Sequence, residues 1–316
     1  MFSRWLAYAV YPIAALACLS PYASPATALG AGIVLALALD NPYQRAGRRL
    51  SKWLLQACVV LLGFGMDLGV VVRTGESGLM FAAVTIAGAF ALGFALTRAF
   101  GIERRVGMLI TAGTAICGGS AIAAVGSSID AHESEMSVAL GTVFMLNAVA
   151  LYLFPPLGHA LGMSQVQFGE WAGMAIHDIS SVVGAASRYG VSALQTATAV
   201  KLSRALWIVP VAVVASLIHR RNTGASAGRL RAPVPWFIGL FLLASVMRTF
   251  IAPVAAAAPV LDTAAERGLT VTLFLIGAGL SKTALKAVGW RPLVKGLLLW
   301  AAISVASAAL VLQLGG

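Results

Sequence analysis

Long apolar stretches separated by short polar connections follow one another along this chain. Most of them approach the roughly 20 residues that an α-helix needs to cross a bilayer. We count eleven, at 5–19, 24–39, 53–72, 78–97, 106–127, 138–157, 168–187, 193–217, 236–252, 269–285 and 293–312. The pattern predicts an all-α membrane protein with about eleven transmembrane helices, in which residues 1–316 form one polytopic domain.

The fifth stretch differs from the others because small and polar residues fill its centre, in the sequence GTAICGGSAIAA at 113–124. Paired glycines are unfavourable inside a helix, and an interrupted helix is tolerated in a membrane only where protein or water satisfies its backbone. Such interruptions form the substrate and ion sites of many secondary transporters. Small residues also serve close helix packing, so both interpretations stay open here. The candidate binding residues are Thr114, Cys117, Gly118, Gly119 and Ser120.

Composition and charge agree with a membrane protein. Hydrophobic residues make up 59% of the chain and charged residues 10%, whereas soluble domains average about 25% charged. The net charge of +11 comes mostly from Lys and Arg in the connections after the second, fourth, eighth and tenth stretches. This positive-inside bias predicts an inner-membrane protein with a cytoplasmic N-terminus and a periplasmic C-terminus, and it gives no indication of nucleic-acid binding.

No pattern typical of an enzyme or a metal site occurs in the sequence. The three cysteines lie in apolar stretches without a CxxC spacing, and neither a nucleotide-binding loop nor a catalytic triad pattern is present. We therefore expect no enzymatic activity, no catalytic residue, no metal and no cofactor.

The two halves of the chain suggest an inverted repeat, with residues 24–157 as the first repeat and 168–312 as the second. In this register the fifth stretch corresponds to the tenth, whose centre contains Gly277 and Gly279. Glycine-interrupted segments at matching positions are the best sequence indication of a transporter site. A second register pairs the third stretch with the tenth, through Gly63, Gly65 and Gly75 against Gly277, Gly279 and Gly289. Either register predicts inverted halves.

Ionisable residues inside the apolar stretches are the remaining candidates, because they are costly in a membrane and usually functional. They are Asp67, His177, Asp178, Lys201, Arg204 and Arg248. His177 and Ser180 share a helical face in the seventh stretch, and this face could oppose that of Cys117 and Ser120 in the fifth. The alternative is helix packing with a satisfied imidazole. Asn147 in the sixth stretch is expected to hydrogen-bond between helices.

Two cations near mid-membrane, Lys201 and Arg204, share a face of the eighth stretch. They need acidic partners or an anionic ligand, and Asp178 can neutralise only one of them. The alternative is a buried ion pair with one Lys that reaches the membrane surface.

Several motifs together resemble the YeiH-type family, whose members are described as sulfate exporters. They are LLGFGMDL (61–68), GTAICGGSAIAA (113–124), FGEWAGMAIHD (168–178), KLSR (201–204) and GAGLSKTALKAVGWRPL (277–293). The resemblance covers nearly the whole chain. It implies the inverted-repeat fold of sodium/proton antiporters and bile-acid symporters, with core and panel domains and broken crossing helices. Ser181 stands where the family often has Gln, so ligand preference could differ.

The expected function is a secondary transporter that exports a small anion, such as sulfate, a related sulfur oxyanion or a sulfonate. Coupling of this export to protons is an option that the sequence leaves open. One alternative is a cation/proton antiporter that uses His177 and Asp178, and another is a membrane scaffold or sensor. The expected partners are the lipid bilayer, the anionic substrate, a coupling proton or sodium ion, and a second copy of the chain in a homodimer.

Overall fold

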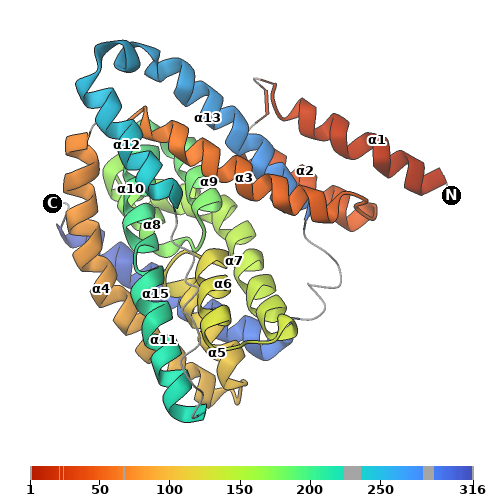
Figure 1. Ribbon diagram of the computed structural model, residues 1–316, viewed down its shortest axis with the longest axis vertical. Helices are drawn as coiled ribbons and strands as arrows, with labels where there is room; N and C mark the ends of the chain where they lie inside the picture. Colours follow the sequence, from red (N-terminus) through yellow and green to blue (C-terminus); the bar gives the residue numbers. More distant parts are fainter. Residues whose placement is uncertain are drawn as a thin grey trace. The chain divides into compact units, whose positions relative to one another are not determined.

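The computed structural model describes residues 2–20, 22–23, 25–66, 68–223, 236–279 and 288–314, and all regular structure in these ranges is α-helical. Figure 1 shows the helices, which are α1 (Phe2–Ala17), α2 (Pro25–Ala38), α3 (Gln44–Gly63), α4 (Leu68–Ala99), α5 (Arg104–Ala115), α6 (Gly119–Ser128), α7 (Glu133–Ala160), α8 (Gln165–Ala175), α9 (Ile179–Tyr189), α10 (Val191–Ala205), α11 (Ile208–Thr223), α12 (Trp236–Phe250), α13 (Ala252–Ala278) and α15 (Trp290–Leu314). Asp67 and positions 280–285 of the tenth expected stretch lie outside the described residues.

Four helical stretches are long and apolar enough to cross a membrane, namely Ala82–Ala99, Ser134–Ala160, Val191–His219 and Trp290–Gln313. Three further helical stretches are apolar but shorter, at Ala7–Ala17, Thr27–Ala38 and Trp236–Phe250. The prediction of an all-α membrane protein is therefore confirmed. The predicted count of eleven crossings is not established by these helices, and two of the eleven stretches fold differently, as described below.

The chain forms two compact units. Unit 1 comprises Met1–Arg73, Val183–Ala185 and Trp236–Thr283, and unit 2 comprises Thr74–Val182, Ala186–Pro235 and Ala284–Gly316. Nearly all of the candidate residues named from the sequence lie in unit 2.

The fifth expected stretch does not cross the membrane as one helix. It folds into α5 and α6, which turn back on each other at residues 116–118. Leu109 of α5 lies beside Gly126 of α6, since a Cβ atom built on Gly126 would be 3.5 Å from Leu109 Cδ2. Arg105 in the first turn of α5 is 3.9 Å from Glu135, which follows α6. Both ends of residues 104–128 therefore meet, and we call this re-entrant segment hairpin 1.

The seventh expected stretch is a second re-entrant segment, built from α8 and α9 with a turn at residues 176–178. Its two ends also meet. Tyr189 at the end of α9 donates a hydrogen bond from its hydroxyl to Met163 O, at 2.6 Å, just before α8. The Ser192 amide donates to Gln165 Oε1 at 3.0 Å. We call residues 165–189 hairpin 2.

The two hairpins open toward opposite ends of α7. Hairpin 1 opens where α7 begins, beside Glu135, and hairpin 2 opens where α7 ends, beside Met163. The prediction that each of these stretches forms one crossing helix was wrong for a physical reason. A segment of about 20 apolar residues can cross once or can enter and return, and hydropathy is the same in both cases.

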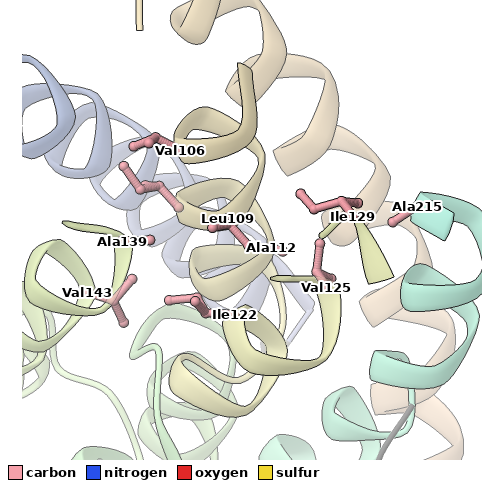
Figure 2. Packing of buried hydrophobic residues seen from close by; sticks show 10 residues of the cluster. Val106, Leu109, Ala112, Ile122, Val125, Ile129, Ala139, Val143 and Ala215 are labelled. Atoms are coloured by element: carbon pink, nitrogen blue, oxygen red, sulfur yellow. The ribbon is translucent and has the colours of Figure 1, made fainter. Parts of the chain in front are cut away.

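Hairpin 1 is held against α7 and α11 by a compact apolar core in unit 2, drawn in Figure 2. Its side chains come from both arms of the hairpin and from the neighbouring helices, and most of them are completely buried. The labelled members are Val106, Leu109, Ala112, Ile122, Val125, Ile129, Ala139, Val143 and Ala215. Because apolar residues from both arms meet in one core, the hairpin is a fixed part of unit 2 and not a loose loop.

In unit 1, α2 and α13 cross where glycine meets glycine. A Cβ atom on Gly277 would lie 2.5 Å from Leu29 O, and one on Gly32 would collide with the backbone of α13. The helix α13 also begins earlier than the tenth expected stretch, at Ala252, because the alanine-rich segment that precedes Leu269 is helical despite its charged residues. Gly277 therefore has a packing reason to be glycine, since helices approach most closely at small residues.

Candidate functional site

The tips of the two hairpins meet in unit 2. A Cβ atom built on Gly118, at the tip of hairpin 1, would lie 3.1 Å from Asp178 Cβ and 3.5 Å from Asp178 Cα, at the tip of hairpin 2. Gly118 has a φ of 70° and a ψ of −126°, a conformation that is accessible to glycine and strained for other residues. The sequence prediction that the polar centres of these two segments face one another agrees with this contact.

Each cation of α10 lies at the carboxyl end of one hairpin arm. Arg204 donates from its guanidinium to Ala115 O, the last residue of α5, and to Thr85 Oγ1 at 2.8 Å. Lys201 donates from Nζ to Ile176 O, which follows the last residue of α8. Both side chains are buried, with exposures of 1% and 0%. Because carboxyl ends of helices carry partial negative charge, the two cations stabilise the hairpin tips.

Asp178 caps the amino end of α9. Its Oδ1 accepts a hydrogen bond from the Ser181 amide at 3.3 Å, which caps α9, and its Oδ2 accepts one from the Ser180 hydroxyl. Asp178 is half-buried. A carboxylate at this position balances the partial positive charge at the start of α9, so the negative charge of Asp178 has a structural use of its own.

The amino end of α6 has no corresponding cap. Its N-cap residue is Gly118, and no side chain accepts a hydrogen bond from the first turn in the manner of Asp178. The Ala121 amide faces the sulfur of Cys117, which is a weak acceptor. Gly119 is half-buried and Ser120 is exposed, while Thr114 and Cys117 are buried. The start of α6 is therefore the reachable, uncompensated helix end at the tips.

The electrostatic balance at the tips favours an anion. Four helix ends meet there, two amino and two carboxyl ends, and their partial charges of roughly one half cancel in pairs. Two cations, Lys201 and Arg204, stand against the single carboxylate of Asp178. The region thus retains about one positive charge, and the amino end of α6 is where backbone amides are free to bind a negative group.

Several buried polar atoms near the tips have no hydrogen-bond partner within the described residues. They are Thr114 Oγ1, Asn147 Nδ2, Arg204 Nε and both ring nitrogens of His177. A buried polar atom without a partner costs roughly 1–3 kcal/mol. Such atoms can form hydrogen bonds with water or another small polar molecule.

The remaining candidate residues lie elsewhere. Gly277 and Gly279 belong to unit 1, where Gly279 is the C-cap of α13 and its carbonyl accepts from Gln44 Nε2 at 3.5 Å. Arg248 also lies in unit 1, in α12. The tips of the hairpins thus bring together the candidates from Thr114 to Ser120, from His177 to Ser181, and Lys201 with Arg204.

Two residues of α15 that bond the hairpins were not recognised from the sequence. Trp300 donates from Nε1 to Ala175 O at 3.1 Å and so satisfies the last carbonyl of α8. Lys295, near the start of the eleventh expected stretch, is fully buried and donates to Gly107 O and, at 2.9 Å, to Thr111 Oγ1, both in α5. A tryptophan near the middle of an apolar stretch was the available signal, because membrane tryptophans concentrate at the interfaces and a buried indole N–H needs a partner.

Outside the membrane-spanning helices, Glu103 lies in the connection before α5. It hydrogen-bonds the side chain of Glu135, and this bond, with partial burial, raises the pKa of Glu103. The pair links the connection before hairpin 1 to the start of α7, the helix that follows it.

Comparison with known proteins identifies the family. The family described as Conserved hypothetical protein 698 matches residues 5–296. A UPF0324 membrane protein of Bdellovibrio bacteriovorus is 49% identical over 95% of this chain and 92% of its own length. Relatives of the same description from Porphyromonas gingivalis and Bacteroides thetaiotaomicron are 48% and 45% identical, each over 92% of this chain and 87% of their own length. No solved structure matches the chain. The chain therefore belongs to the YeiH-like family of UPF0324 membrane proteins.

Proposed function

We propose that this protein is a secondary transporter that binds a small anion where the tips of hairpins 1 and 2 meet. The observation that carries the proposal is the amino end of α6, which is reachable at Ser120 and has no capping carboxylate. Lys201 and Arg204 add a positive field from behind the tips. Re-entrant or broken helices that present their ends at mid-membrane are a recurring design for substrate sites in secondary transporters.

The resemblance to sulfate exporters makes sulfate, related sulfur oxyanions and small sulfonates the first substrates to test, with export from the cytoplasm as the expected direction. The competing function is a cation/proton antiporter in which Asp178 binds the cation. Its support is the half-buried Asp178 carboxylate at the tips. The two functions differ in what they require of Asp178.

The replacement Asp178→Asn separates the two functions. The amide keeps an oxygen that can accept from the Ser181 amide, so the cap of α9 is retained. In an anion transporter this change removes a repelling charge, and we expect anion affinity to rise several-fold, since a charge–charge interaction near a protein surface is worth on the order of 1 kcal/mol or more. The measurement is uptake of labelled sulfate, sulfite and small sulfonates into proteoliposomes, with and without a pH gradient.

Two results would contradict an anion transporter. One is a wild-type protein that moves none of these anions under any gradient. The other is loss of all ion binding in Asp178→Asn together with proton-driven cation flux in the wild type, which is the behaviour of the antiporter. Matched wild-type and variant protein levels in the liposomes are the control.

We further propose a revised membrane topology. Replacing two of the eleven expected crossings by hairpins leaves nine, which keeps the N-terminus in the cytoplasm and the C-terminus in the periplasm of an inner-membrane protein. The connection at 161–164, which contains no Lys or Arg, moves to the periplasmic side, where the positive-inside rule allows it. The inverted relation of residues 24–157 and 168–312 stays a prediction. Its support is that the two hairpins open toward opposite ends of α7.

Cysteine labelling tests this topology. In a chain whose native cysteines are replaced by serine, Leu161→Cys should react with a membrane-impermeant maleimide on intact cells. Ser134→Cys should react only after the membrane is permeabilised. Both positions are exposed, so accessibility depends on the side of the membrane. Eleven full crossings predict the opposite pattern at both positions, and that pattern would rule out re-entrant hairpins.

A further inference from the structure

The imidazole of His177 is buried without any hydrogen-bond partner in the described part of the chain. Its exposure is 0%, and neither Nδ1 nor Nε2 is bonded. A neutral imidazole presents one donor and one acceptor, and both would be unsatisfied. Each such group costs roughly 1–3 kcal/mol when it stays dry.

Asn147 of α7, which contacts the backbone of His177, also has a buried polar atom without a partner in the described structure. Asn147 Oδ1 accepts the His177 backbone amide at 3.1 Å, which fixes the orientation of the side-chain amide, because the flipped orientation would set two donors against each other. Asn147 Nδ2 therefore points away from that bond, and it is buried without a partner in the described structure. Two buried residues that are joined by one hydrogen bond thus leave donors and an acceptor open in the described structure.

Three polar side chains near His177 already have hydrogen-bond partners. The Trp300 ring lies 6.2 Å from the His177 ring, but its N–H is bonded to Ala175 O. Lys201 Nζ is bonded to Ile176 O. Asp178 accepts from the two serines that follow it. The missing partner is consequently a small molecule that can both donate and accept, and water is the molecule that fits such a site.

We propose that His177 and Asn147 bind internal water, and that the His177 ring transfers the coupling proton through it. This inference rests on the proposed transport function. A protonated water on one side gives its proton to the free ring nitrogen, and the opposite ring N–H releases its proton to water on the other side. One N–H bond forms and one breaks, and no oxidant or reductant is needed. Asn147 Nδ2 donates to the water and holds it in place.

The proposed proton site at His177 and the proposed anion site at the start of α6 both lie against α7. Leu140, Phe144 and Asn147 share one face of α7. The first two are the nearest neighbours of a Cβ atom built on Gly119, at 3.4 and 3.5 Å, and the third holds His177. Phe144 and Asn147 are three residues apart, roughly 5 Å along the helix axis. A proton on His177 and an anion at the start of α6 would attract each other, which is the physical basis for moving them together.

His177 differs from the charged side chains nearest to it, because those side chains already bond helix ends. Lys201 of α10 interacts electrostatically with His177, and Asp178 follows His177 directly in the turn of hairpin 2. On α7 the described titratable side chains are Glu135 and His159 near the two ends and Tyr152, which is exposed. On α15 the nearest is Lys295, more than one turn before Trp300. Lys201 bonds the Ile176 carbonyl at the end of α8, and the Asp178 carboxylate caps the start of α9.

The variant His177→Gln tests the proposal. Glutamine keeps a donor and an acceptor for the water but cannot carry a proton between pH 5.5 and 8.5. We expect proton movement per transported anion, read with a pH dye inside proteoliposomes and compared at equal anion flux, to be lost in this variant. His159→Gln is the matched control, because His159 is exposed and stacked on Tyr189, and it should keep the wild-type proton ratio.

A high-resolution density map of the wild-type protein supplies a second readout that does not depend on transport. Density for water between Asn147 Nδ2 and the His177 ring supports the site, and direct protein partners on both ring nitrogens would overturn it. An unchanged proton ratio in His177→Gln would overturn the proton role. A wild type that carries no anion would remove the proposed function and the coupling role with it, while the map would still decide the water site on its own.

Discussion

Gly118→Ala is expected to reduce anion transport more than tenfold. Gly118 adopts φ 70° and ψ −126°, where a side chain is strained by about 1–3 kcal/mol. The added Cβ would also lie 3.1 Å from Asp178 Cβ, closer than most real contacts, so the tips of the hairpins would have to separate. Uptake into proteoliposomes, normalised to the amount of reconstituted protein, measures the effect.

Gly119→Ala is the matched control for this change. A Cβ on Gly119 meets Leu140 and Phe144 at 3.4 and 3.5 Å, which is ordinary van der Waals contact, and the backbone amide that faces the proposed anion is retained. We expect transport to stay within about threefold, since a small added group in open contact costs less than 1 kcal/mol or so. Equal activity in both variants would mean that the backbone conformation at the tip of hairpin 1 is not needed for transport.

Arg204→Ala is expected to destabilise the protein and to weaken anion binding together. The guanidinium is 1% exposed and bonds the last carbonyl of α5 and Thr85. Hydrogen bonds of a charged group contribute roughly 1.5–3 kcal/mol each, so we expect a loss of about 3 kcal/mol or more, seen as a lower melting temperature in detergent. The same replacement removes one of the two cations at the tips, and anion affinity should fall at least tenfold.

Two further variants make this result specific. Arg204→Lys keeps a positive charge and one donor for Ala115 O, so it should recover part of the anion affinity but not the bond to Thr85. Arg188→Ala removes an exposed arginine at the end of hairpin 2 and should change neither quantity. A variant Arg204→Ala with wild-type stability would show that the guanidinium does not hold the end of α5.

Stability and substrate binding are expected to be linked at this site for a physical reason. Lys201 and Arg204 each have a structural partner at a helix end, but their full charges exceed the partial charges that they meet. The excess charge is available to an anion without breaking either hydrogen bond. The two cations can therefore fix the hairpin tips and attract a substrate at once, so the alternatives of structure and function left open for them by the sequence need not exclude each other.

The sequence by itself determined that this is an all-helical membrane protein, because apolar stretches of bilayer length with few charges have no other stable form in lipid. It also indicated the candidate residues of the hairpin tips, since glycine pairs and ionisable groups are costly in such stretches. Asn147 was correctly expected to hydrogen-bond between helices, as it does to the His177 amide.

Only the tertiary structure decided how those stretches run. Hydropathy measures how many apolar residues a segment has, not whether its two ends meet. The contacts of Arg105 with Glu135 and of Tyr189 with Met163 are what distinguish hairpins 1 and 2 from full crossings. The partners of Lys201, Arg204 and Trp300 are backbone carbonyls. Every residue has such a carbonyl, and therefore no sequence pattern marks the ones that are left free at a helix end.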